Sequence, residues 1–271
     1  MRSRITGRNR GITEAAMYTY DGEFKGRTFL ITGSGKGIGS GMAIAAGEAG
    51  ANVVVHYNTS AQSAEEVFRK VQATGCPCVL VRSDLSEPEG PSRLYEEAVR
   101  AFGGVDVLVN NAALEYHKNF DGYDTETIRH LFRVNLRGYT MMSHLVMPGM
   151  KERGFGRIIN ISSTNGINTY YPMCFDYDAS KAALNSLTHD LAVQFSPYVT
   201  VNAVAPGFIG TEKELDGYDE EFLKEECEKI LVKRYGKPEE VAELVAFLVS
   251  EKANYINNAI MRIDGGQMGS C

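Results

Sequence analysis

The sequence predicts an α/β protein in which a doubly wound parallel sheet of about seven strands is covered by helices on both faces. Short and almost continuously apolar runs recur along the chain, as they do in parallel strands that are buried on both faces. Longer stretches with helical spacing separate these runs, and strands that alternate with helices form parallel sheets.

The expected elements follow one another in strict alternation. The strands are Thr28–Thr32, Asn52–His56, Cys78–Arg82, Val105–Asn110, Arg157–Ser162, Thr200–Ala205 and Ile260–Ile263. The helices are Gly37–Ala49, Ser63–Thr74, Gly90–Phe102, Asp124–Arg153, Tyr177–Phe195 and Pro238–Ser250. No stretch rich in Pro, Gly or Ser divides the chain, so residues 21–271 are expected to form one domain.

Two segments stand apart from this alternation. Residues 1–20 carry Arg2, Arg4, Arg8 and Arg10 and little periodic apolar content, so we expect a disordered N-terminal arm. The stretch Gly207–Tyr235 is acidic and lies between a strand and a helix, so we expect a substrate lid around 207–235.

Charge and composition exclude several functional classes. The net charge of −6 argues against a nucleic-acid partner, and no apolar run is long enough to cross a membrane. The first residues lack the apolar core of a secretory signal, and the odd number of irregularly spaced cysteines predicts free thiols in a reducing compartment. We therefore expect a cytoplasmic protein without membrane or nucleic-acid partners.

A glycine-rich loop directly follows the first expected strand. It reads Gly33-Ser34-Gly35-Lys36-Gly37-Ile38-Gly39 and leads into a helix. Backbone N–H groups at a helix N-terminus suit a pyrophosphate, and glycines allow its close approach. The loop alone is weak evidence of a dinucleotide, but its place after the first strand of an alternating series strengthens it.

Several motifs together resemble the short-chain dehydrogenase/reductase family. The spacing Thr32-Gly33-x-x-x-Gly37-x-Gly39 resembles the family's glycine fingerprint, and Asn110-Asn111-Ala112-Ala113 resembles its Asn-Asn-Ala-Gly motif, with Ala113 in place of Gly. Asn258 likewise stands where the family has Gly, and Asn tolerates a left-handed backbone. The resemblance covers roughly residues 24–268 and implies a single-domain Rossmann fold that binds a nicotinamide dinucleotide.

The resemblance also implies which positions contact the cofactor. They are Gly33, Ser34, Lys36, Gly37, Ile38, Gly39, Tyr57, Asn58, Thr59, Ser60, Asp84, Leu85, Asn111, Ala112, Ala113, Tyr177, Lys181, Pro206, Gly207, Ile209 and Thr211. No acid that would bind a ribose 2′-OH follows Val53-Val54-Val55, whereas Lys36 and the polar run Asn58–Ser60 suit a 2′-phosphate. We therefore expect NADP, with NAD as the less favoured alternative.

Tyr177 and Lys181 lie four residues apart and share one face of a helix. A nearby ammonium and the positive nicotinamide ring favour the phenolate and would lower the pKa of Tyr177. The resemblance assigns Ser163, the second of two adjacent serines, to the substrate oxygen, and Asn135 to a water linked to Lys181. Asn135, Ser163, Tyr177 and Lys181 are thus the expected catalytic residues.

The expected reaction is the NADP(H)-dependent reduction of a small-molecule carbonyl, or the reverse oxidation of an alcohol. Tyr177 would supply the proton and regain it through the cofactor ribose, Lys181 and water. One alternative is a 3-oxoacyl-carrier-protein reductase, for which Arg153 is a candidate contact although Gln194–Tyr198 holds no second arginine. Another is a non-enzymatic NADP-sensing Rossmann protein.

Two further expectations concern metals and assembly. His117 and His189 have no partner at a ligand spacing, so no metal site is expected. The resemblance implies a homotetramer formed through the helical stretches Asp124–Arg153 and Tyr177–Phe195.

Overall fold

Seven parallel strands form one sheet in the part of the chain that the computed structural model describes, namely Tyr20 and residues 22–168 and 173–267. The strands are β1 (Thr28–Ile31), β2 (Asn52–Tyr57), β3 (Cys78–Arg82), β4 (Val107–Asn110), β5 (Gly156–Ile161), β6 (Val199–Pro206) and β7 (Ile260–Ile263). Their order is β3-β2-β1-β4-β5-β6-β7, which confirms the doubly wound Rossmann fold. The expected arm falls almost wholly on residues 1–19, outside the described residues.

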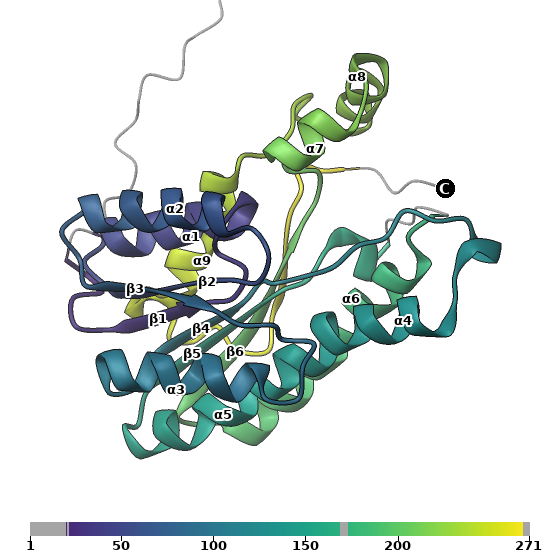
Figure 1. Cartoon of the computed structure of the whole chain (residues 1–271). Helices are drawn as coiled ribbons and strands as arrows, with labels where there is room; N and C mark the ends of the chain where they lie inside the picture. The colour runs from purple at the N-terminus through teal and green to yellow at the C-terminus, as the bar shows by residue number, and fades with distance from the viewer. Residues whose placement is uncertain (1–19, 21, 169–172, 268–271) are drawn as a thin grey trace, which may run out of the picture.

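Helices cover both faces of this sheet. They are α1 (Gly37–Glu48), α2 (Ala61–Ala73), α3 (Gly90–Phe102), α4 (Thr125–Phe132), α5 (Tyr139–Glu152), α6 (Phe175–Phe195), α7 (Glu212–Gly217), α8 (Glu220–Lys229) and α9 (Pro238–Val249). Figure 1 shows α1, α2 and α9 on one side of the strands and α3 and α5 on the other.

The alternation of side chains along the strands builds a core on each face. In β1, Phe29 and Ile31 belong to the core beneath α1 and α9, while Leu30 belongs to the core beneath α3 and α5. Each is almost fully buried, and burying such a side chain contributes about 1.5–3 kcal/mol. The two cores fix the sheet, and with it the loops at the carboxyl ends of the strands.

The single helix expected over Asp124–Arg153 is interrupted. A π-helical segment at Arg133–Gly138 separates α4 from α5. Asn135 lies in this segment and is fully buried. Extra-wide turns of this kind often occur at functional sites, because the inserted residue redirects a side chain.

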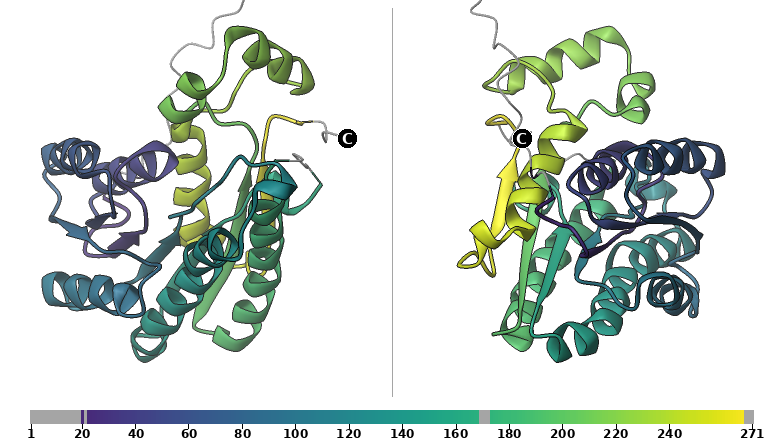
Figure 2. Two further views of the ribbon diagram at one scale, coloured as in Figure 1. Left: turned by 45° about the vertical axis from the view of Figure 1, so that its right-hand side comes forward. Right: turned by 90° about the vertical axis from the view of Figure 1, so that its left-hand side faces the viewer.

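The expected lid contains two short helices that sequence periodicity did not reveal. Thr211 and Asp219 cap α7 and α8, since each side chain accepts a hydrogen bond from a backbone N–H of its helix. Figure 2 shows α7 and α8 projecting from the body of the domain in both views. The segment therefore stands above the carboxyl ends of the strands as an ordered element.

Three smaller expectations can be compared with the described residues. Cys76, Cys78, Cys174 and Cys227 are free thiols, and Cys271 lies outside the described residues. Asn258 adopts a φ of 63°, the left-handed conformation in which it replaces glycine. Among the described helices, none is long and apolar enough to cross a membrane.

Candidate active site

The glycine loop between β1 and α1 is shaped for close approach of a ligand to the backbone. Gly33 and Gly37 have φ values of 65° and 57°, which favour glycine. A Cβ at Gly39 would lie 2.6 Å from the Gly33 carbonyl oxygen and 2.7 Å from Asn111 Nδ2. A side chain there would therefore displace the backbone that forms the loop.

His56, at the end of β2, holds this loop in place. Its Nδ1 accepts a hydrogen bond from Gly33 N at 2.9 Å, and its Nε2 lies 3.0 Å from the Ser83 carbonyl oxygen. Because a carbonyl can only accept, Nε2 carries the proton and the ring is neutral. Burial lowers the pKa of His56 to about 4, which keeps it neutral at physiological pH. Sequence reasoning gave His56 no function.

Asn111 fastens the loop after β4 to the end of β1. Its Nδ2 donates to the Thr32 carbonyl at 2.9 Å, and its backbone N–H donates to Thr32 Oγ1 at 2.8 Å. Ala113, which replaces a glycine of the family motif, is tolerated because among described non-glycine residues only Lys233 and Asn258 have a left-handed φ. The departure at Ala113 therefore leaves the loop intact.

A cavity of about 820 Å³ lies at the carboxyl ends of β1, β2, β4, β5 and β6. The expected cofactor positions that line it are Gly33, Lys36, Ile38, Gly39, Tyr57, Asn58, Thr59, Ser60, Asp84, Leu85, Asn111, Ala112, Ala113, Tyr177, Lys181, Pro206, Gly207, Ile209 and Thr211. Ser34 and Gly37 do not line it. The Ser34 hydroxyl turns inward, donating to the Ile31 carbonyl at 2.8 Å and accepting from His56 N at 2.9 Å.

The end of the cavity beneath α2 carries cationic and polar groups. Lys36 is exposed at its rim, and Asn58, Thr59 and Ser60 line it. Asp84 is also present, but its carboxylate accepts from Ser86 N at 2.8 Å and from the Asn58 side chain, which lowers its pKa despite partial burial. The donor set and the glycine cradle suit a dinucleotide.

Tyr177 and Lys181 face the same cavity from the first turns of α6. The Lys181 ammonium lies 5.4 Å from the centre of the Tyr177 ring and donates to the Ile161 carbonyl at 2.7 Å. Ser163 shares a hydrogen bond with the Tyr177 phenol. Ser162 also borders the cavity, but its hydroxyl is bonded to Asn185 Oδ1 at 2.7 Å. The structure thus places Ser163, not Ser162, against Tyr177.

The pKa of Tyr177 in the protein alone is governed mainly by burial. Burial raises it well above its usual value, and the Glu115 carboxylate raises it further. Burial lowers the pKa of Lys181 to about 7. A lysine that readily loses its proton stabilises a phenolate only weakly, so Lys181 does not offset the effect of burial on Tyr177.

Asn135 does not border the cavity. Its side chain pairs with both backbone groups of Leu114, with each hydrogen bond 2.8 Å long, and donates to Ser180 Oγ at 3.1 Å. It therefore ties the loop after β4 to the π-helical segment and to α6. Its observed contacts position the elements around Tyr177.

Arg153, the candidate carrier-protein contact, lies near the amino end of β4, whereas the cavity lies at the carboxyl ends of the strands. It pairs with Asp106 Oδ1 at 3.1 Å and donates to the Val105 carbonyl at 2.6 Å, and both residues precede β4. Arg153 therefore does not border the cleft at the carboxyl ends of the strands.

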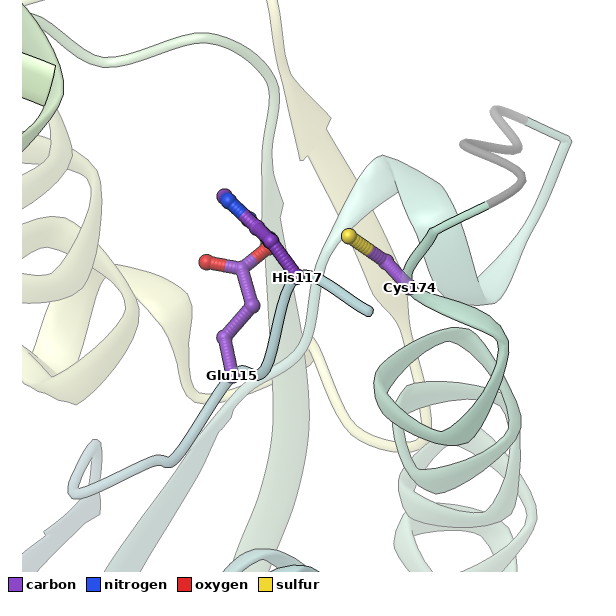
Figure 3. A group of neighbouring side chains, drawn as sticks. All are labelled: Glu115, His117 and Cys174. Atoms are coloured by element: carbon purple, nitrogen blue, oxygen red, sulfur yellow. The ribbon is translucent and has the colours of Figure 1, made fainter. Parts of the chain in front are cut away.

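Sequence reasoning missed the residues at the far end of the cavity, beyond Tyr177. Glu115 and His117 come from the loop after β4, and Cys174 precedes α6. Figure 3 shows the Cys174 sulfur pointing toward His117, beside Glu115. Phe208, Glu214, Tyr218 and Phe222 complete this end from the segment that contains α7 and α8. These residues are far apart in sequence, so no local spacing could identify them.

Comparisons with known proteins agree with this architecture. The sequence model of the family described as enoyl-(acyl carrier protein) reductase matches residues 33–268. Glucose 1-dehydrogenase 2 of Bacillus subtilis is 34% identical, with 90% of this chain and 95% of the relative covered. The 3beta-hydroxysteroid dehydrogenase 1 of Eggerthella lenta is 34% identical, with 91% and 95% covered.

Solved structures give the same result. Acetoin dehydrogenase YohF of Salmonella typhimurium has a TM-score of 0.81 and 32% identity, covering 89% of this chain and 96% of that chain. A mutant short-chain dehydrogenase/reductase of Serratia marcescens has a TM-score of 0.83 and 31% identity, covering 90% and 98%. The chain therefore belongs to the short-chain dehydrogenase/reductase family and is an NAD(P)-dependent oxidoreductase that acts on alcohol or carbonyl groups.

Proposed function

We propose that this protein is an NADP(H)-dependent reductase of a small-molecule carbonyl, with Tyr177 as the general acid. The observation that carries the proposal is the position of the Tyr177 phenol, which lines the cavity, is hydrogen-bonded to Ser163 and lies beside Lys181. A phenol held at this position is placed to donate a proton to a substrate oxygen in the cavity, as carbonyl reduction requires.

The chain's own residues divide the work of proton transfer. The Tyr177 phenol and the Ser163 hydroxyl bind and orient the substrate oxygen, and the nicotinamide supplies the hydride when it is bound. Tyr177 then gives its proton to the oxygen as negative charge develops there. Lys181, whose pKa lies near 7, can carry the replacement proton at physiological pH. Oxidation of an alcohol would use the same groups in reverse order.

The preference for NADP is supported by the groups at the α2 end of the cavity. Lys36 supplies a positive charge there, and Asn58, Thr59 and Ser60 supply hydrogen-bond donors for a phosphate. No carboxylate stands in the run from His56 to Ser60, where one would bind a ribose 2′-OH and repel a phosphate. We assign the cavity-lining cofactor positions named above to NADP.

The substrate end favours a molecule without a large negative charge. Glu115 and Glu214 line the cavity together with Tyr177, and their negative charges add to burial in raising the pKa of that phenol. Phe208, Tyr218 and Phe222 give the same end an apolar wall. A small, neutral carbonyl compound fits these surroundings better than a 3-oxoacyl group attached to an acidic carrier protein. Arg153, the candidate contact for such a carrier protein, does not border the cavity.

The segment around 207–235 is proposed as the lid over this substrate. It contributes the aromatic wall through Phe208, Tyr218 and Phe222 and projects from the domain (Figure 2). The proposed homotetramer uses the surfaces of α4, α5 and α6, and Val193, which is 74% exposed on α6, lies on one of these helices.

The test combines cofactor binding with turnover. NADPH should raise the melting temperature more than NADH does, and Lys36→Ala should remove most of that difference. NADPH oxidation is then followed with ketones, sugars, quinones and an acetoacetyl thioester. Equal protection by both cofactors would refute the NADP preference, and no turnover with any substrate would favour the cofactor-sensing alternative.

A further inference from the structure

We propose that Glu115, His117 and Cys174 form a zinc-binding site at the substrate end of the cleft. Each offers one ligand atom, and these atoms lie within 4.8 Å of one another. Carboxylate oxygen, imidazole nitrogen and thiolate sulfur are the donors that Zn²⁺ binds in proteins. Figure 3 shows the three side chains converging on a common space from two segments of the chain.

The separations are already close to those of a coordinated ion. His117 Nε2 and Glu115 Oε1 are 3.4 Å apart. Two ligands with zinc bonds of about 2.0 Å at a tetrahedral angle would lie about 3.3 Å apart. With a zinc–sulfur bond of about 2.3 Å, the sulfur would lie about 3.6 Å from the other two ligand atoms, so it has to move by at most roughly 1.2 Å from the 4.8 Å limit.

The backbone holds the two segments in this arrangement. Lys118 N donates to the Met173 carbonyl at 3.2 Å, which joins the residue after His117 to the residue before Cys174. The Tyr123 hydroxyl is 3.2 Å from the Met173 carbonyl and 3.0 Å from Asp176 Oδ1. The ligands are therefore brought together by the fold before any ion is bound, which lowers the entropic cost of binding.

The electrostatic surroundings favour a cation. Three carboxylates belong to the two segments that carry the ligands: Glu115 in the loop after β4, and Asp176 and Asp178 in the first turn of α6. The two aspartates are buried, so their negative charge is only weakly screened by water. A divalent ion would neutralise this charge, and its bond to sulfur would release the thiol proton to solvent.

Three protein ligands leave a fourth tetrahedral position for water or another small molecule. The ligands border the same cavity as Tyr177, so an ion with its fourth ligand would occupy space that the carbonyl substrate needs. Zinc should therefore compete with substrate and leave NADPH binding unchanged. This kinetic consequence rests on the proposed reductase function, whereas zinc binding itself does not.

The direct test is calorimetric titration of ZnCl₂ into the full-length, reduced and chelator-treated protein. One zinc per chain is expected. Cys174→Ser and His117→Gln should each weaken binding by more than about 100-fold, since loss of even an outer partner of a zinc ligand costs 10–100-fold. The matched controls are Cys76→Ser/Cys78→Ser, which removes two thiols outside the proposed site, and His189→Gln on α6; both variants should bind zinc normally.

Cobalt provides a readout independent of turnover. Co²⁺ should give a thiolate-to-metal absorption band that Cys174→Ser abolishes and Cys76→Ser/Cys78→Ser retains. The proposal is overturned if zinc does not bind, if the Cys174 and His117 variants bind it normally, or if only the Cys76/Cys78 control loses binding. An inactive protein that still binds zinc at these residues would refute the reductase function and leave the metal site standing.

Discussion

Replacing Lys181 with methionine should stabilise the protein while abolishing its activity. The side chain is 1% exposed, and burial lowers its pKa from 10.5 to about 7. Lys181 is fully protonated in the unfolded chain at neutral pH, whereas burial disfavours its protonated form in the folded protein. This difference lowers the free energy of unfolding at neutral pH. Methionine has a similar length and no charge, so it removes this cost.

The magnitude follows from the two pKa values. Linkage gives a cost of about 4 kcal/mol at pH 7 and about 2 kcal/mol at pH 9. The variant loses the hydrogen bond from Nζ to the Ile161 carbonyl, which leaves a buried acceptor unpaired at a cost of about 1–3 kcal/mol. Lys181→Met should therefore be more stable at pH 7 by about 1–3 kcal/mol.

The sign of the pH dependence is the stricter test. The depressed pKa means that the wild type gains stability as pH rises from 7 toward 10.5 and loses it as pH falls toward 7. The advantage of Lys181→Met should shrink by about 2 kcal/mol between pH 7 and pH 9. Urea unfolding of both proteins measures it. A variant that is less stable at pH 7, with a gap independent of pH, would contradict the account.

Three further perturbations test the framework around the site. The buried His56 imidazole, with a pKa of about 4, contributes stability above pH 6.5 and loses that contribution as pH falls toward 4. His56→Gln should therefore reduce the loss of unfolding free energy between pH 7 and pH 5 by about 2 kcal/mol. Urea unfolding measures this loss, and an unchanged pH dependence in the variant would exclude the role. Asn135→Ala should lower the unfolding free energy by about 2–4 kcal/mol, because both Leu114 backbone groups lose their partners; a loss below about 1 kcal/mol would show that Asn135 does not join these segments. Val193→Glu should convert the proposed tetramer into smaller species in light scattering, and an unchanged mass would place the contact elsewhere.

Much of the fold could be predicted because its signals are local. The apolar run Thr28–Ile31 and the glycine loop after it are neighbours in sequence, so their order already identifies the first strand, the turn and the helix. The substitution at Asn258 could be interpreted because the cost of a left-handed backbone depends on residue type alone.

The remaining features depend on tertiary contacts. The π-helical segment around Asn135 keeps a helical apolar pattern and is set by hydrogen bonds to Leu114, a residue in another segment. The raised pKa of Tyr177 comes from burial and from Glu115, which no spacing connects to it. Cys174 reaches His117 only because β4 ends, and α6 begins, at the carboxyl ends of the strands.

The most direct test of the central claim is the comparison of wild type with Tyr177→Phe in NADPH-dependent carbonyl reduction. The variant removes only the phenolic oxygen, so the account predicts a loss of kcat by at least about 100-fold, the usual contribution of a positioned acid. NADPH should still bind with nearly wild-type affinity, as measured by fluorescence titration. A Tyr177→Phe enzyme that keeps most of its turnover would show that another group supplies the proton and would refute the mechanism.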